Sequence, residues 1–152
     1  MKKFALALAA LLTLAGLVSL PGTASAATSC SGNLIDRKVV NYGGAPIAEL
    51  AVYYDSSTGQ NCARMNHLGV TYNRSYRTTV FIVACTERTP GPVCHYYGAP
   101  DTQDGNYALY AGPVHVTARG RCIHAAGDIY YPTSAPTNKR HVETSPPASH
   151  CG

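Results

Sequence analysis

The chain has 152 residues, of which 13% are charged, and a formal net charge of +4 at pH 7. A surface with so weak a charge excess gives no electrostatic basis for binding nucleic acid or an anionic membrane, because such partners select strongly basic surfaces. We therefore predict no nucleic-acid partner and no membrane partner.

Residues 1–26 have the pattern of an export signal. Lys2 and Lys3 form a positive start, an apolar run extends from Phe4 to Leu20, and Ala24-Ser25-Ala26 matches the small-residue site that signal peptidase cleaves. The interrupted apolar run falls short of the ~20 uninterrupted residues of a spanning helix. Cleavage after Ala26 leaves 152 − 26 = 126 residues, one domain in size, with two lysines fewer and a net charge of 10 − 8 = +2. We therefore expect a secreted protein, found outside the cell or on the spore or cell surface.

Alternation of apolar and polar residues predicts strands in the first half of the mature chain. One face of Ile47–Asp55 is the expected core face. Its members are Ala48, Leu50, Val52 and Tyr54. Ser56-Ser57-Thr58-Gly59 has turn composition, so Gln60–His67 is expected to return as the partner strand.

The next strand, Thr78–Cys85, is apolar on both sides, which favours a position at the centre of a sandwich. Three further strands are predicted at 107–111, 114–118 and 122–131, separated by Gly112-Pro113 and Arg119-Gly120. No segment has the pattern of a long amphipathic helix. The fold class is therefore all-β: a disulfide-stapled sandwich or barrel of about six to eight short strands.

The domain boundary follows composition. Residues 27–131 form the β-rich domain, and 132–152 form a segment rich in Pro, Ser and Thr without periodicity. We expect this C-terminal segment to run irregularly over the surface until Cys151 ties it down.

Six cysteines in an exported chain predict three disulfides, since the space outside the cell is oxidising. They are Cys30, Cys62, Cys85, Cys94, Cys122 and Cys151. Cys85 and Cys94 bracket the reversal Pro90-Gly91-Pro92, so we expect these two to pair, which contributes about 2–3 kcal/mol in the chain-entropy model. The other four allow three pairings. We prefer Cys62 with Cys122, and Cys30 with Cys151.

Several stretches resemble one family of small secreted actinobacterial proteins. They are Val52–Cys62, Asp104–Val114, Gly120–Ile123, Gly127–Ile129 and His150-Cys151-Gly152. In these stretches the chain is similar to the spore-associated protein A family. The resemblance implies an exported protein found with spores or the aerial-growth surface, and it implies no particular biochemical activity. The pair Cys85 and Cys94 departs from the family pattern, as does the long Pro-rich tail.

The sequence offers no catalytic constellation. It has no G-x-S-x-G elbow, and cysteines held in disulfides supply no thiol nucleophile. We therefore predict that the protein is not an enzyme and uses no cofactor.

Two segments raise the question of a metal. If Arg119-Gly120 forms a two-residue hairpin turn, His115 and His124 lie opposite each other on one face, yet two imidazoles are only half of a zinc site. The oxygen-rich segment 101–106 lacks the alternation of an EF-hand loop, and an Asp-Gly turn explains it better. We therefore predict no metal site.

Tyrosine is abundant, with eleven residues and no tryptophan, and it occurs in three doublets. The doublets are Tyr53–Tyr54, Tyr96–Tyr97 and Tyr130–Tyr131. One ring of each doublet on a strand is expected to face outward, where it can stack on a glycan or another surface. These six tyrosines are the candidate binding residues.

Two functions follow. The preferred one is a non-catalytic surface protein that associates with a spore-surface or cell-wall component through exposed tyrosines. The alternative is a protease inhibitor that presents Arg88-Thr89 on the disulfide-braced loop, where rigidity limits the ordering cost of binding a protease.

Overall fold

The computed structural model describes residues 29–152. The expected export signal, 1–26, lies outside the described residues. Apart from two single-turn 3₁₀ helices at Gly69–Thr71 and Pro136–Asn138, the regular structure of residues 29–152 is β-strand.

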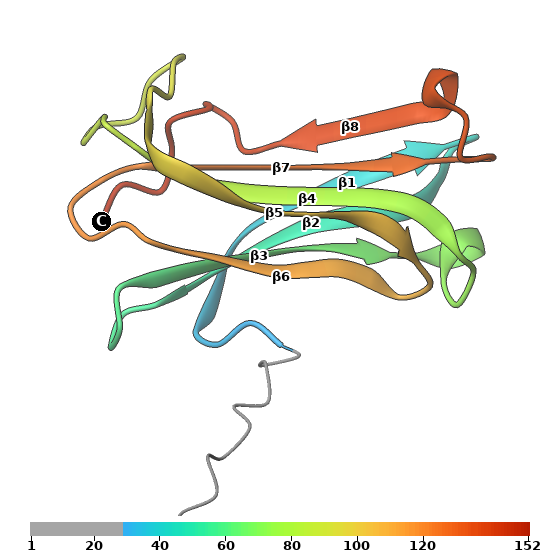
Figure 1. Ribbon diagram of the computed structural model, residues 1–152, viewed down its shortest axis with the longest axis horizontal. Helices are drawn as coiled ribbons and strands as arrows, with labels where there is room; N and C mark the ends of the chain where they lie inside the picture. The colour runs from blue at the N-terminus through green and yellow to red at the C-terminus, as the bar shows by residue number, and fades with distance from the viewer. Residues whose placement is uncertain (1–28) are drawn as a thin grey trace, which may run out of the picture.

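Eight strands form two four-stranded antiparallel sheets that pack face to face (Figure 1). The first sheet has the order β1-β2-β3-β6 and the second has the order β5-β4-β7-β8. The strands are β1 (Asn33–Tyr42), β2 (Ala45–Asp55), β3 (Gln60–His67), β4 (Tyr76–Cys85), β5 (Tyr96–Tyr107), β6 (Tyr110–Thr117), β7 (Ile123–Tyr130) and β8 (Lys139–Glu143). The predicted all-β fold is confirmed, and it is a sandwich.

The core lies between the two sheets. Ala48, Leu50 and Val52 of β2 are buried in it, as the alternation predicts, and they face Val80 and Ile82 of β4. Burying one such aliphatic side chain contributes about 1.5–3 kcal/mol, so this layer is a main source of stability. Two further predictions are confirmed. Strand β3 returns beside β2 as its hairpin partner, and β4 is a central strand with a neighbour on each side.

The strand predictions around Gly112-Pro113 are wrong, because β6 continues through this pair. The register of β3 against β6 shifts between Ala63 and Met65, where β6 carries an extra residue. Gly112 has a φ of 101°, which is open to glycine and strained for other residues. The pair therefore forms a bulge, which tolerates proline inside a sheet, and it does not end the strand.

The segment 101–106, expected to be a turn, lies inside strand β5. Strand β5 is an edge strand of the second sheet. Its Asp104 forms an ion pair with Arg77 of β4, with an Nη2–Oδ2 distance of 2.8 Å. Its side chains also reach the edge of the first sheet: the Gly112 N–H donates to Gln103 Oε1, and the His115 N–H donates to Asp101 Oδ2. An edge strand that is polar on both faces has no apolar alternation, which is why the sequence pattern misses it.

The C-terminal segment is more regular than expected. Residues 139–143 form β8, which pairs with β7, and single bridges join Gly91 to Ala148 and Ile123 to Ser149. The segment therefore extends the second sheet and then crosses its end, where Cys151 ties it to the fold.

One disulfide prediction is confirmed and the other two are wrong. Cys85 pairs with Cys94 as expected, whereas Cys30 pairs with Cys62 and Cys122 pairs with Cys151. Cys62 and Cys122 lie in different sheets: β3 belongs to the first, and Cys122 directly precedes β7 of the second. Cys62 therefore pairs with Cys30, which precedes β1 of the same sheet, and Cys122 pairs with Cys151, which follows β8 of the same sheet.

Candidate binding face

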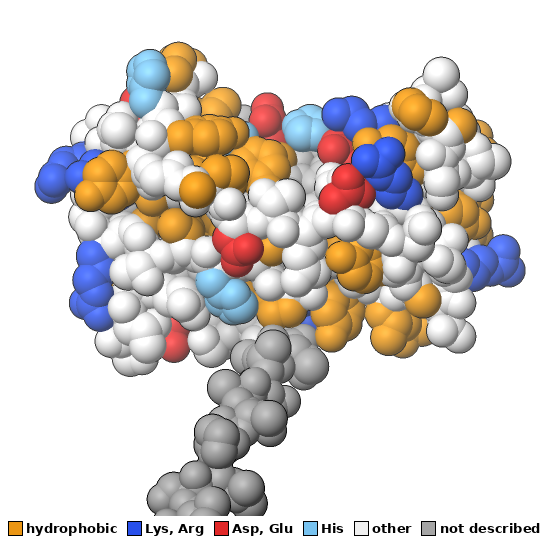
Figure 2. All heavy atoms as spheres, viewed as in Figure 1, with side chains coloured by type: hydrophobic (Ala, Val, Ile, Leu, Met, Phe, Trp, Pro, Cys, Tyr) orange, Lys and Arg blue, Asp and Glu red, His pale blue; other side chains and the backbone are white. Residues whose placement is uncertain are grey.

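The outer surface of the β5-β4-β7-β8 sheet carries the exposed Tyr96 ring and a connected network of polar side chains. Figure 2 shows this side of the molecule, where hydrophobic side chains gather over one end of β4 and β5 and charged side chains lie beside them. We call this surface the outer face. Side chains alternate along a strand, so every second residue of β4 and β7 reaches it while the intervening residues enter the core.

Three rings from neighbouring strands form an aromatic row on the outer face. Phe81 of β4 lies between Tyr96 of β5, at a centroid distance of 6.4 Å, and His124 of β7, at 5.3 Å with the rings edge to face. Tyr96 is 51% exposed, whereas His124 is buried. The row thus offers one exposed ring on an ordered aromatic support, which reduces the entropy lost when a ligand stacks on it.

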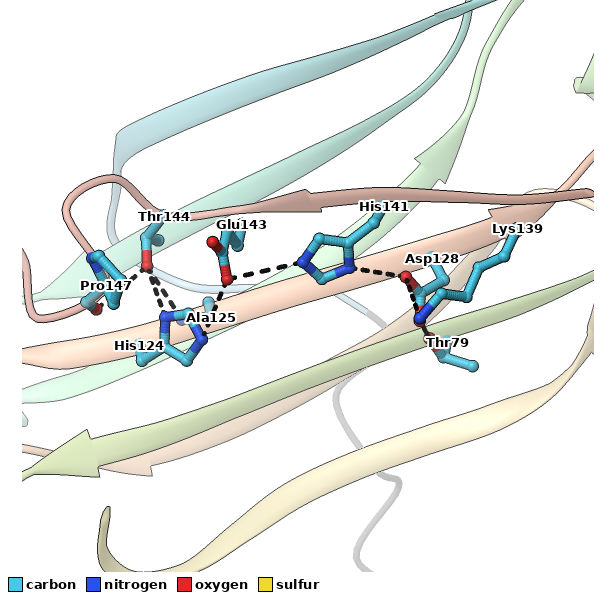
Figure 3. A network of polar contacts seen from close by, with 9 residues as sticks. All are labelled: Thr79, His124, Ala125, Asp128, Lys139, His141, Glu143, Thr144 and Pro147. Atoms are coloured by element: carbon cyan, nitrogen blue, oxygen red, sulfur yellow. Dashed lines mark hydrogen bonds and ion pairs between the residues drawn. The ribbon is translucent and has the colours of Figure 1, made fainter. Parts of the chain in front are cut away.

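A chain of polar side chains continues from His124 along β7 and β8 (Figure 3). Glu143 Oε2 lies 3.5 Å from His124 Nε2 and 3.6 Å from His141 Nε2. On its other side, His141 Nδ1 lies 2.7 Å from Asp128 Oδ1. The Asp128 carboxylate also accepts a hydrogen bond from Thr79 Oγ1 at 3.0 Å. The two acids and two imidazoles therefore hold one another in fixed positions.

Burial favours the neutral form of His124. Desolvation of the His124 ring lowers its pKa, and the nearby Glu143 carboxylate opposes that change. The Thr144 hydroxyl, 3.2 Å from His124 Nδ1, fixes the ring orientation. Near neutral pH the face therefore presents a neutral His124 beside two carboxylates, which accept hydrogen bonds.

An ion pair between Arg77 and Asp104 lies beside this polar network on the outer face. Arg77 forms a two-point contact with Asp104, with distances of 2.8 and 3.1 Å, and its guanidinium lies 4.7 Å from the centroid of the Tyr130 ring. The Arg77 guanidinium lowers the pKa of Asp104 through this hydrogen bonding. The outer face therefore combines an exposed aromatic ring with ordered hydrogen-bonding groups of both kinds.

The tyrosine doublets differ from one another. Tyr96 and Tyr97 are both exposed, and the Tyr97 ring lies 3.8 Å from the Arg121 guanidinium. Neither ring of the doublet 130–131 is exposed. Tyr130 is buried beneath Arg77, and Tyr131 packs edge to face against two other tyrosines.

Tyr53 and Tyr54 are half-buried on opposite sides of β2. Tyr54 lies on the expected core face of that strand and lines a small pocket at the end of the sandwich. The structure therefore leaves the doublet 96–97 as the pair with two exposed rings.

The hairpin that would bring His115 opposite His124 does not form. His115 of β6 lies opposite Cys62 in the first sheet, and His124 of β7 lies opposite Val83 in the second. Arg119-Gly120 connects the two sheets and does not form a hairpin between paired strands, so the two imidazoles are not neighbours.

Sequence reasoning missed Phe81, His141, Glu143 and Asp128 as members of this face. Strand β8 is five residues long, and its outward residues are all charged or titratable. The sequence does carry a strand pattern here: Lys139, His141 and Glu143 alternate with half-buried Arg140 and Val142. The pattern is only five residues long and lies in a segment whose composition is typical of a loop.

Within residues 29–152, no helix is long and apolar enough to cross a membrane.

The comparisons with known proteins support the resemblance seen in the sequence. The chain is 35% identical over 114 residues to spore-associated protein A of Streptomyces coelicolor, in a match that covers 71% of this chain and 65% of that relative. The chain thus matches slightly less than two thirds of the relative's length. No family model matches the chain. No solved structure matches it. The predicted resemblance is confirmed: the chain is similar to spore-associated protein A.

Proposed function

We propose that this protein is an exported, non-catalytic surface protein that associates with the spore or cell wall through the outer face. The observation that carries the proposal is the exposed Tyr96 ring, which packs against Phe81 at one end of the aromatic row. At the other end of the row, His124 lies 3.5 Å from the Glu143 carboxylate. The name of its relative, spore-associated protein A, supports the cellular location.

The chemistry of the outer face suits a polyhydroxylated glycan. The Tyr96 ring offers an apolar platform for the C–H face of a sugar, and its hydroxyl offers a polar contact at the same place. The Glu143 carboxylate is 45% exposed at its side chain and accepts hydrogen bonds from sugar hydroxyls. Wall and spore-surface glycans are therefore the partners that we propose.

Export is part of the same proposal. The basic, apolar and small-residue pattern of 1–26 supports cleavage by signal peptidase, and three disulfides support an oxidising destination. N-terminal sequencing of the protein from culture supernatant is expected to begin at Ala27 or within two residues of it. Recovery of a chain that still carries Lys2 and Lys3 would contradict export.

The binding proposal is tested by incubating the purified mature protein with washed spores and with cell-wall preparations. Tyr96→Ala is expected to weaken binding by a few-fold to about ten-fold, since one stacking contact contributes roughly 0.5–1.5 kcal/mol beyond its buried area. Tyr72→Ala is the matched control, because Tyr72 is 61% exposed and lies on the connection between β3 and β4. Equal binding by the wild type and both variants would contradict the proposal that the protein binds through the outer face.

The alternative function, protease inhibition, makes the opposite prediction. Arg88 and Thr89 lie on the loop closed by Cys85 and Cys94, and both are exposed, as an inhibitor requires. The resemblance to a spore-associated protein favours the surface role, so we rank inhibition second. Tight inhibition of a trypsin-like or subtilisin-like protease that is lost in Arg88→Ala, with no effect of Tyr96→Ala, would overturn the preferred function.

A further inference from the structure

A small pocket opens at one end of the sandwich, between the inner side of the first sheet and the C-terminal residues. Its walls are Ile35 of β1, Tyr54 of β2 and Asn61 of β3, together with Ala118, which follows β6. The C-terminal residues, including Cys151, form the remaining wall. The cavity has a volume of about 180 Å³. It is separate from the outer face, because it lies on the inner side of the first sheet.

Asn61 is the unusual residue of this pocket. Side chains alternate along β3, and Ala63 and Met65 belong to the core, so the Asn61 side chain also points inward. The residue is 3% exposed, and its side-chain oxygen, Oδ1, has no hydrogen-bond partner among residues 29–152. A buried acceptor without a partner is costly, so a protein that keeps one is expected to use it.

The other lining groups do not satisfy this oxygen. Ile35 and Ala118 are apolar, and His150 Nε2 lies 3.1 Å from Asp36 Oδ2. Within the described part of the chain, the walls bring no Asp, Glu, Lys or Arg side chain to the pocket. A matching ligand is therefore neutral and pairs a single hydrogen-bond donor with an apolar body.

The volume limits the size of the ligand. An apolar protein cavity of about 150 Å³ accepts one benzene molecule. A pocket of about 180 Å³ has room for one six-membered aromatic ring with a small polar substituent. We infer that the end pocket is a binding site for a small neutral aromatic donor of the size of phenol, which supplies the missing partner of Asn61. Oδ1 is buried in the observed orientation, and a turn of the side-chain amide toward the pocket lets it accept from the ligand's O–H or N–H. This inference does not depend on the glycan proposal, which concerns another surface.

The test compares two probes of nearly equal shape. Phenol carries the donor, and toluene replaces its hydroxyl with a methyl group. Two-dimensional amide NMR titrations of the mature protein at pH 7 are expected to show saturable shifts at Ile35, Tyr54, Asn61 and Ala118. Phenol is expected to bind about ten-fold more tightly than toluene, because only phenol satisfies the buried acceptor.

The variant Asn61→Leu separates a binding role from a structural one. It is expected to lose the preference for phenol over toluene, while its resistance to urea stays equal to or higher than that of the wild type, since an unsatisfied buried group is removed. Asn106→Leu, at an exposed position of β5, is the matched control and is expected to keep the preference.

The comparison of phenol with toluene on the wild type needs no variant, so the inference stays testable if Asn61→Leu fails to fold. Absence of saturable phenol binding, equal affinities for the two probes, or shifts confined to other residues would overturn it. A large loss of stability in a folded Asn61→Leu variant would show that Asn61 is structural, and this too would overturn it.

Discussion

Burial favours the neutral form of two histidine rings in the folded protein. His67 lies between the Thr78 hydroxyl, 2.7 Å from Nε2, and the Thr71 carbonyl oxygen, 3.2 Å from Nδ1. Burial lowers the pKa of His67, as it lowers that of His124. Protonating either ring is therefore harder in the folded chain than in the unfolded one.

This difference predicts that the protein becomes less stable as the pH falls from 7.5 to 5. Below about pH 6.5 the unfolded chain binds protons at both histidines that the folded chain does not, so the free energy of unfolding decreases. Asp104, whose pKa is lowered by Arg77, loses its contribution only at lower pH, near the ordinary aspartate pKa of 3.8 and below. Urea unfolding at pH 7.5, 6.5 and 5 measures the slope.

The variants His67→Gln and His124→Gln assign the slope to its residues. Each is expected to show a smaller fall in stability over this range than the wild type, because one of the two titrating groups is gone. A slope equal to the wild-type slope in both variants would show that other groups control the pH dependence.

Among the strands, β6 depends on a single glycine. The extra residue at the Gly112-Pro113 bulge lets β6 continue past the register shift and pair with β3 on both sides of it. A side chain at Gly112 has no room, because its Cβ would lie 2.8 Å from the Ala63 carbonyl oxygen. The backbone φ of 101° adds strain for any other residue.

Gly112→Ala is therefore expected to destabilise the protein by about 1–3 kcal/mol. Gly91→Ala is the matched control. A Cβ at Gly91 would meet nothing within 4 Å, so its effect is expected to stay within about 0.5 kcal/mol. Urea midpoints of the two variants and the wild type provide the measurement. Equal midpoints for all three would show that the bulge is not under the proposed constraint.

For the molecule as a whole, the disulfides fix the ends of the chain to the sandwich. Cys30–Cys62 ties the N-terminal end to β3, and Cys122–Cys151 ties the C-terminal segment to the start of β7. The second of these holds the wall of the end pocket in place, because Cys151 lines it. Peptide mapping without reduction is expected to recover these two pairs, and a fragment joining Cys30 to Cys151 would contradict the structure.

Loop length predicts the order in which the disulfides matter. The sequence separation is 29 residues for Cys122–Cys151 and 9 for Cys85–Cys94. In the chain-entropy model these loops contribute about 3.5 and about 2.5 kcal/mol. Paired Cys→Ser variants are therefore expected to lose more stability for the 122–151 pair. The reverse order in urea unfolding would show that local contacts of the 86–95 loop outweigh chain entropy.

The sequence by itself determined the features that depend on local chemistry. The alternation of Ala48, Leu50 and Val52 identified an inward face, because a strand repeats every two residues. The Pro-Gly-Pro reversal identified the Cys85–Cys94 pair, because a short loop leaves its ends close together. The resemblance to spore-associated protein A was identified from short motifs such as Tyr110–Val114, because such a resemblance is carried by the order of residues along the chain.

Only the tertiary structure decided which separate segments meet. The edge strands β5 and β8 carry few apolar residues, so their place depends on hydrogen bonds to β4 and β7 that the sequence does not display. The same is true of the outer face, where Tyr96, His124 and Glu143 come from three strands brought together by sheet order. Sequence spacing placed His124 opposite His115. Sheet order placed it beside Glu143, because non-local strand pairing overrides proximity along the chain.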